Sequence, residues 1–221
     1  MSSPTTLPHA SAPVYAVGAP LAEADLAVIL VHGRGADAAD ILGLAGDLVP
    51  DGAEGRIAFL APEAEGHVWY PYPFRQPRAT NEPWLSGALA TLDALVDRVR
   101  DGRPSLPVVV GGFSQGACLA LEYVARGSRP IAGVAAFSGA LIGPSLVEHP
   151  PIADLDGRWV FLGCGDRDGF FTLDVARESA QALADAGATV DFRTYAGMGH
   201  TINADETGAI RSLIAGALLP R

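Results

Sequence analysis

Short apolar runs alternate along the chain with longer segments in which apolar residues recur every three or four positions. The runs predict β-strands, because strands covered on both faces of a parallel sheet are apolar almost throughout. Six strands are expected, at Leu26–Val31, Ile57–Ala61, Pro107–Gly112, Ile131–Phe137, Trp159–Gly163 and Val190–Tyr195.

The clearest helical pattern begins near Pro83, where one apolar stripe follows the three-and-four spacing, and it stops at Gly102. Asn81 is predicted to cap its N-terminus. Three more helices are expected: one after Ser114, one from Leu173 to Ala186, and one from about Glu206 to the end of the chain.

This alternation predicts an α/β protein with a mostly parallel central sheet and helices on both faces. Residues 1–13 are rich in Ser, Pro and Thr and are expected to be a loose N-terminal arm. No internal repeat or linker divides the rest, so residues 14–221 are predicted to form a single domain.

Composition narrows the functional classes. Hydrophobic residues make up 49% of the 221 residues and charged residues 18%, which is typical of a folded domain and not of a disordered chain. Acidic residues outnumber basic ones 25 to 15, giving a net charge of −10 and arguing against a nucleic-acid partner. The longest apolar run, Leu26–Val31, is far shorter than the roughly 20 residues of a membrane-spanning helix.

The N-terminal region carries no basic residue before Arg34, unlike a signal or transit peptide, and a cytoplasmic location is expected. Cys118 and Cys164 are the only cysteines and are too widely spaced for a zinc cluster. We expect both to pack as small apolar residues, and we expect no metal and no cofactor.

A Gly-x-Ser-x-Gly sequence joins the third predicted strand to the helix that follows it: Gly112-Phe113-Ser114-Gln115-Gly116. So tight a turn holds the serine in a strained conformation and leaves no room for side chains at the two glycines. It also places Ser114 at a helix N-terminus, where the helix dipole favours negative charge. Ser114 is therefore the predicted nucleophile.

A serine nucleophile needs a base, and a base needs an acid that orients it; in this arrangement both follow later in the chain. His200, in a loop after the last strand that we expect to be mobile, is the predicted base, whereas His149 is predicted to lie at the surface. Two aspartates, Asp166 and Asp168, follow the fifth strand, and the residues alone leave both open as the acid.

Backbone N–H groups must also bind the negative oxygen of the reaction intermediate. One is expected from Gln115, directly after the nucleophile, and the other from Arg34, in the Gly-rich loop after the first strand. His32 in that loop is predicted to brace it and not to act as a second base.

Together these motifs resemble the phospholipase/carboxylesterase family of the α/β-hydrolase superfamily, which includes the acyl-protein thioesterases. The matching segments are Val31–Gly35, Gly111–Ala117, Gly165–Asp168 and Tyr195–His200. The resemblance implies an α/β-hydrolase fold and points to Asp168 as the acid, because the family uses the second aspartate of an Asp-x-Asp pair. The chain departs from the family in continuing with Gly169-Phe170-Phe171-Thr172 and in carrying Cys164 where many members have histidine.

The long segment between Gly66 and Trp84 is rich in aromatic residues and is expected to be a lid or a binding loop. Trp69 and Tyr70 are predicted to form an apolar wall for the substrate, with Phe170 and Phe171 beside the acid. Leu141–Gly143 is a further predicted part of the rim.

These expectations describe a serine hydrolase that cleaves small to medium carboxylic esters through an acyl-enzyme, with thioesters left open. One alternative is a lactone or carbon–carbon hydrolase of aromatic breakdown products; dienelactone hydrolases resemble this arrangement but use a cysteine nucleophile. Another is a catalytically silent protein that binds a small ligand. The expected partner is a small-molecule ester, and a homodimer is left open.

Overall fold

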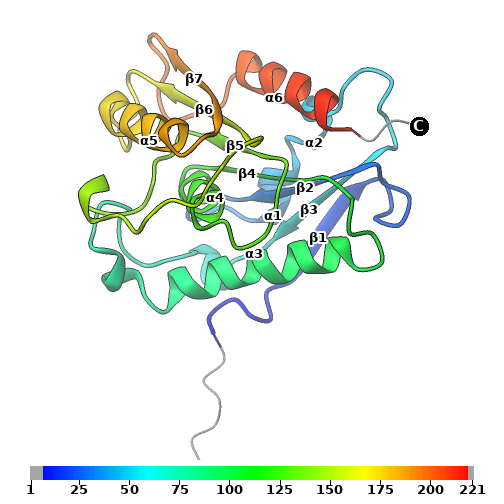
Figure 1. Ribbon diagram of the computed structural model, residues 1–221, viewed down its shortest axis with the longest axis horizontal. Coiled ribbons are helices and arrows are strands. Elements are labelled where there is room, and N and C mark those ends of the chain that lie inside the picture. The colour runs from blue at the N-terminus through cyan, green and yellow to red at the C-terminus, as the bar shows by residue number, and fades with distance from the viewer. Residues whose placement is uncertain (1–6, 219–221) are drawn as a thin grey trace, which may run out of the picture.

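The computed structural model describes residues 7–218 of the chain. A seven-stranded sheet runs through the molecule in the order β1-β3-β2-β4-β5-β6-β7 (Figure 1). Neighbouring strands run parallel, except that β1 pairs antiparallel with β3. The strands are β1 (Val14–Gly18), β2 (Leu26–Val31), β3 (Ile57–Pro62), β4 (Val108–Phe113), β5 (Gly133–Phe137), β6 (Trp159–Gly165) and β7 (Thr189–Tyr195).

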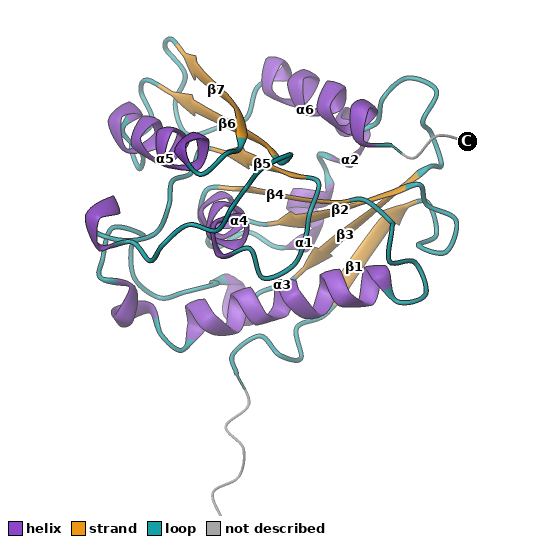
Figure 2. Ribbon diagram, in the orientation of Figure 1, coloured by secondary structure: helices purple, strands orange, loops and turns teal. Residues whose placement is uncertain are grey.

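Helices cover both faces of this sheet (Figure 2). One face carries α3 (Trp84–Arg100), α4 (Gln115–Arg126) and α5 (Leu173–Asp185), and the other carries α1 (Ala38–Leu42), α2 (Ala45–Leu48) and α6 (Ala204–Ala217). Three short 3₁₀ helices lie in the connections: η1 (Glu65–His67), η2 (Arg78–Asn81) and η3 (Leu146–Glu148). The predicted α/β architecture is confirmed.

Strand β2 shows why these strands are apolar throughout. Its alternate side chains point to opposite faces of the sheet, as in any strand. Ala27, Ile29 and Val31 join the core under α3, α4 and α5, whereas Leu26, Val28 and Leu30 join the core under α1, α2 and α6. All six predicted strands are present, with ends within two residues of the expected ones.

Apart from the 3₁₀ helices, three elements were not predicted from the sequence. Strand β1 lies at the sheet edge with Tyr15 and Val17 exposed, so it lacks the apolar run of a buried strand. Helices α1 and α2 are only five and four residues long, too short to show a repeating pattern. Within residues 7–218, none of the helices combines the length and hydropathy needed to span a membrane.

The predicted cap of the long helix is wrong. Pro83 is the N-cap residue of α3. Asn81 lies in η2 instead, where its buried side chain accepts a hydrogen bond from the Tyr72 N–H at 2.9 Å. An Asn side chain that caps a turn has the same sequence signature as one that caps a helix.

The N-terminal segment is not loose where the structure describes it. Residues 1–6 lie outside the described residues, but His9 is 1% exposed. Its Nε2 donates to the carbonyl oxygen of Trp69 at 3.0 Å, and its Nδ1 accepts from the N–H of Glu65 at 3.1 Å. The Thr91 hydroxyl on α3 donates to the His9 carbonyl. His9 therefore attaches this segment to the domain through specific hydrogen bonds.

Candidate active site

Ser114 stands at the carboxyl end of β4, the middle strand of the sheet, and directly precedes α4. Its backbone has φ 57° and ψ −117°, a conformation that costs energy for any residue with a side chain. A Cβ on Gly112 would lie 2.5 Å from the Gly116 carbonyl carbon, and one on Gly116 would lie 2.0 Å from the Val31 oxygen. The predicted strained serine and closely packed glycines are confirmed.

His200 is held by a buried carboxylate. Its Nδ1 donates to Oδ2 of Asp168 at 2.7 Å, and the Asp168 side chain is fully buried. The other carboxylate oxygen accepts the backbone N–H groups of Phe170 at 2.8 Å and Phe171 at 3.1 Å. Burial raises the pKa of Asp168, but these hydrogen bonds outweigh burial and leave its pKa below the ordinary value. A neutral His200 ring therefore carries its proton on Nδ1 and presents Nε2 as an acceptor.

Asp166 contacts the backbone of the loop that carries His200. Its carboxylate accepts the backbone N–H of Gly197 at 2.7 Å, and its own N–H donates to the carbonyl of Tyr195 at 3.0 Å. Asp166 thus braces the loop that carries His200 without contacting the imidazole. The structure brings Asp168 to His200, and so separates the two aspartates that the residues alone left open.

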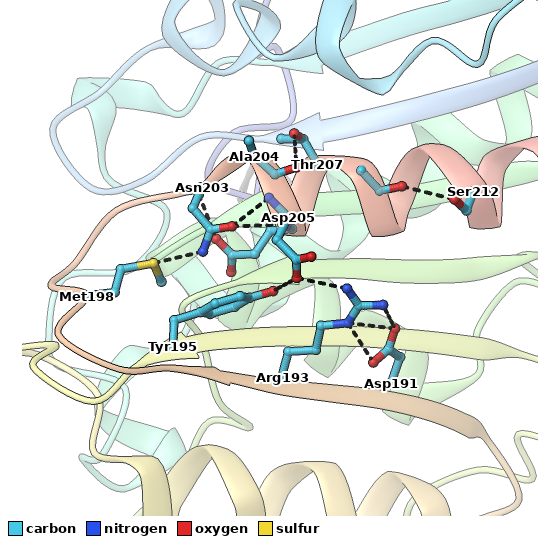
Figure 3. A network of polar contacts seen from close by, with 11 residues as sticks. Asp191, Arg193, Tyr195, Met198, Asn203, Ala204, Asp205, Thr207 and Ser212 are labelled. Carbon is cyan, nitrogen blue, oxygen red and sulfur yellow. Dashed lines mark hydrogen bonds and ion pairs between the residues drawn. The ribbon is translucent and has the colours of Figure 1, made fainter.

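Contacts with α6 and its N-cap also hold the loop that carries His200 (Figure 3). Asn203, the N-cap of α6, donates from Nδ2 to the Met198 sulfur at 3.0 Å. The Tyr195 hydroxyl donates to Asp205 at 2.8 Å, and Arg193 pairs with the same carboxylate. The loop expected to be mobile is therefore anchored to β7, to α6 and to the Asp166 turn.

Ser114 and His200 line one cavity of about 520 Å³. Its walls are mostly apolar, and five aromatic side chains contribute: Tyr70, Phe74, Phe113, Phe170 and Phe171. The Phe113 ring lies 4.6 Å from the His200 ring and the Phe170 ring 4.8 Å, measured between centroids, although Phe170 is 72% exposed. The predicted Tyr70, Phe170 and Phe171 are thus part of this cavity. The sequence does not mark Phe113, which stands at the variable position of the elbow, or Phe74, which is one of many rings in its loop.

Trp69 does not line the cavity, and its predicted role is wrong. The side chain is fully buried, and its indole N–H donates to the His32 carbonyl at 3.0 Å. Its ring packs between those of His9 and His32, with centroids 5.3 and 5.0 Å away. Tyr70, the next residue, is also buried, but its side chain lines the cavity.

The side chains of Arg34 and Gln115 hold the cavity wall. The Arg34 guanidinium donates to the carbonyl oxygens of Tyr70 at 2.7 Å, Pro71 at 3.0 Å and Tyr72 at 3.3 Å. The Gln115 amide accepts from the Trp69 N–H at 3.0 Å and donates to Tyr70 at 2.8 Å.

Both residues line the cavity. Among residues 7–218, their backbone N–H groups have no protein acceptor, which leaves these two amides free to bind a ligand oxygen. That is the arrangement expected of donors aimed at a substrate oxygen.

His32 braces the first loop, as predicted. Its Nε2 accepts the Ala64 N–H at 3.1 Å, so Nδ1 carries the proton and donates to the Gly33 carbonyl at 2.7 Å. Burial lowers the pKa of His32, which keeps the ring neutral. Cys118 is buried as expected, but it lines the cavity, and burial raises the pKa of its thiol to about 12.

Two predictions about the segment after β5 are wrong. Leu141–Gly143 lies in a separate, smaller cavity and not at the rim beside Ser114. His149 is not a surface residue: its side chain is 6% exposed and contacts the buried carboxylate of Glu122 at 2.8 Å. Nothing in the sequence indicates that Glu122, within a helix, pairs with His149.

Comparison with known proteins decides the family. The sequence profile described as Phospholipase/Carboxylesterase matches residues 13–217, which is nearly the whole chain. The chain belongs to this family. The crystal structure of a phospholipase/carboxylesterase from Dyadobacter fermentans DSM 18053 superposes with a TM-score of 0.82 at 35% identity, over 92% of this chain and 96% of that one. That of esterase PE8 gives a TM-score of 0.76 at 25% identity, over 94% and 98%.

Curated relatives place the phospholipase/carboxylesterase family among ester and thioester hydrolases. A probable carboxylesterase of Oryza sativa subsp. japonica is 31% identical over 128 residues, which cover 58% of this chain and 48% of that protein. Acyl-protein thioesterase 1 of Debaryomyces hansenii is 30% identical over 140 residues, covering 61% and 60%. The chain therefore spans only about half to three fifths of the length of the curated relatives it matches. It is a member of a hydrolase family that contains carboxylesterases and acyl-protein thioesterases.

Proposed function

We propose that the protein is a serine hydrolase that cleaves neutral, small to medium carboxylic esters, and that thioesters are a second substrate class. One observation carries the proposal: Ser114, in its strained turn, lines the same cavity as His200, whose Nδ1 donates to the buried Asp168 at 2.7 Å. A nucleophile, a base and an orienting acid are the groups that acyl transfer requires.

In this mechanism the Ser114 hydroxyl attacks the ester carbonyl while His200 Nε2 takes its proton. Asp168 stabilises the imidazolium, and the N–H groups of Arg34 and Gln115 bind the negative oxygen of the tetrahedral intermediate. The imidazolium then gives its proton to the departing alkoxide, leaving an acyl-enzyme. Water, deprotonated by the same imidazole, attacks the acyl carbonyl, and the imidazolium then returns the proton to the Ser114 oxygen as the carboxylic acid is released.

The cavity favours a neutral acyl group. Its walls are mostly apolar, and its volume of about 520 Å³ lies within the range of small-molecule sites. Three of the five N–H groups of the Arg34 guanidinium donate to carbonyl oxygens of the loop, so this side chain serves to hold the cavity wall. Burial of an unpaired carboxylate in such surroundings is costly.

The test is hydrolysis of p-nitrophenyl esters from acetate to decanoate by the wild type and by Ser114→Ala, with an acyl thioester and an enol-lactone as further substrates. We expect ester turnover by the wild type and a loss of about a thousandfold or more in the variant. Intact-mass analysis after treatment with a fluorophosphonate should show one adduct, located at Ser114. Folded wild type that cleaves only the lactone, or a variant that keeps its activity, would overturn the proposal.

A further inference from the structure

A second buried carboxylate lies on the helix that begins after Ser114. Glu122 is on α4, and the spacing of four residues from Ser114 to Cys118 and on to Glu122 places all three along one side of the helix. The Glu122 side chain is fully buried. It accepts hydrogen bonds from His149 Nε2 at 2.8 Å, from the Ile142 N–H at 2.7 Å and from the Arg78 guanidinium. Arg78, Glu122 and His149 are called the charged cluster below.

The charge on Glu122 is maintained by its partners. Burial raises the pKa of this carboxyl, but the hydrogen bond from His149 and the charge of Arg78 outweigh burial and leave its pKa below the ordinary value. A buried carboxylate is tolerated only when it is paired in this way, and removal of one partner is strongly unfavourable. The cluster therefore joins three parts of the chain firmly: α4, η2 and the segment that contains η3.

Geometry also fixes the charge on His149. Its Nε2 faces the Glu122 carboxylate at 2.8 Å, and its Nδ1 faces the Pro150 carbonyl oxygen at 2.7 Å. Both partners are acceptors, so both ring nitrogens must carry protons and the ring is an imidazolium. The hydrogen bond to Glu122 raises the pKa of His149, while the like charge of Arg78 lowers it. Helix α5 packs against η3 and brings a further carboxylate to this region: Glu178, which lines a small cavity with Leu146 of η3.

The charged cluster is connected to the wall of the acyl cavity. Arg78 donates to the Ile142 carbonyl at 3.2 Å, and the next residue, Gly143, donates its N–H to the Phe74 carbonyl at 2.8 Å. The Phe74 ring lines the cavity and stacks on Phe171 with the ring centroids 4.7 Å apart. The Phe171 ring in turn lies 5.8 Å from that of His200. Phe74 is therefore the second ring away from the base.

We propose that Glu122 is a positioning residue for the acyl site: through Arg78, His149 and the segment around Ile142 it holds Phe74 in place, and so determines how well longer acyl groups bind. The inference rests on the proposed ester hydrolysis. A two-carbon acyl group on Ser114 stays beside His200 and Phe171, whereas a longer one extends to Phe74. Loosening of Phe74 therefore weakens the binding of long acyl groups and leaves short ones unaffected.

The proton on His149 makes this preference dependent on pH. As pH rises through the raised pKa of His149, the ring loses one N–H and can no longer satisfy both Glu122 and Pro150. The charged cluster then holds the segment around Ile142 less firmly. Phe74 is fixed less well as a result, and the preference for longer acyl groups falls.

The experiment measures kcat and KM for p-nitrophenyl acetate and hexanoate with the wild type, Glu122→Gln and His149→Gln. Loss of contact with one or two methylene groups predicts a rise in the hexanoate KM of about four- to fifteenfold. The acetate KM and both kcat values should stay within about twofold. Asp97→Asn, which breaks an exposed ion pair between Asp97 of α3 and Arg129, is the matched control and should behave as wild type.

An NMR titration of His149 gives a second readout. The hexanoate-to-acetate ratio of kcat/KM in the wild type should fall over the pH range in which His149 titrates, and it should not follow that titration in His149→Gln. If Glu122→Gln does not fold, the milder His149→Gln decides alone.

An unchanged ratio in folded variants, or an equal loss with both esters, overturns the inference while the esterase proposal stands. Failure of the wild type to cleave any ester overturns both.

Discussion

Gly116 packs so closely against Val31 that a Cβ on the glycine would lie 2.0 Å from the Val31 carbonyl oxygen. Val31 ends β2 and Gly116 lies in the first turn of α4, so this contact determines how near the helix approaches the sheet beneath Ser114. A side chain at position 116 can be accommodated only if the helix moves, because the atom it meets belongs to the backbone.

Gly116→Ala is therefore expected to displace α4 and the serine that precedes it. We expect a decrease of about 2 kcal/mol or more in the free energy of unfolding, and a loss of about a hundredfold in kcat with p-nitrophenyl acetate. Urea unfolding and steady-state kinetics measure the two effects.

Gly208→Ala is the matched control, because a Cβ on this α6 glycine has no other atom within 4 Å. It should raise the unfolding free energy by about 0.5–1 kcal/mol and leave kcat unchanged. Similar behaviour of the two variants would show that the contact with Val31 does not constrain the helix.

The two aspartates after β6 should respond very differently to substitution. Asp168→Asn replaces the acceptor of the His200 Nδ1–H by a group that can also donate, so the imidazole loses its orientation and its preferred tautomer. We expect kcat to fall by about a thousand- to ten-thousandfold. In Asp166→Asn the side-chain oxygen can still accept the Gly197 N–H, and kcat should fall by less than about threefold. Comparable losses in the two variants would contradict the assignment of Asp168.

Much of the fold was predictable because the strands at the centre of the sheet are buried on both faces. The position of β4, the elbow at Ser114 and the helix after it all follow from local rules: apolar runs, closely packed glycines and a strand-to-helix turn. The same rules fail at β1, where four of the five residues are exposed, and at α1 and α2, where one turn of helix leaves no period to detect.

Site residues could be predicted only where a motif of neighbouring residues identifies them. Ser114 and His200 each stand in a recognisable loop, but the choice between Asp166 and Asp168 depends on which carboxylate the fold turns inward. Trp69 and Tyr70 are adjacent and both buried, yet only Tyr70 lines the cavity. The pairing of His149 with Glu122 depends on a contact across 27 residues, which a single sequence does not reveal.

The contact of His9 with the loop behind the cavity gives a prediction for stability. His9→Leu removes the hydrogen bonds to Trp69 and Glu65 and leaves a buried carbonyl and N–H without partners. We expect the free energy of unfolding at pH 8 to fall by about 1–3 kcal/mol, measured in urea. Leu7→Ala, in the same segment but with a side chain 43% exposed, should cost less than about 1 kcal/mol. An equal effect of the two substitutions would argue against a specific role of the imidazole.

The effect of His9→Leu on the free energy of unfolding should depend on pH. Burial lowers the pKa of His9 below 6.5, so the folded protein favours the neutral ring. The contribution of His9 is complete above pH 6.5 and is lost as pH falls through its lowered pKa. The stability difference between wild type and His9→Leu should therefore shrink in acid.

Glu206 should have the opposite pH dependence. Its carboxyl is fully buried in the capping box of α6, where Oε2 accepts the Asn203 N–H at 2.9 Å. The other oxygen, Oε1, has no hydrogen-bond partner among residues 7–218 and lies where a Cβ on Gly163 would be. Burial, partly offset by the Asn203 hydrogen bond, raises the pKa of Glu206 to about 7, so the folded state favours the protonated acid.

A raised pKa means that the contribution of Glu206 to stability is complete below 4.5 and is lost as pH rises through about 7. Glu206→Gln keeps an oxygen for Asn203 but cannot ionise, so its stability should not decline over that range. We expect the unfolding free energy of the variant, relative to wild type, to rise steadily between pH 4.5 and 7 and then to level off. Urea unfolding at several pH values measures this, with Asp174→Asn, an exposed carboxylate on α5, as the control that should show no such trend. A difference that stays constant with pH would mean that Glu206 is ionised in the folded protein, and its unpartnered oxygen would then have to be satisfied by water.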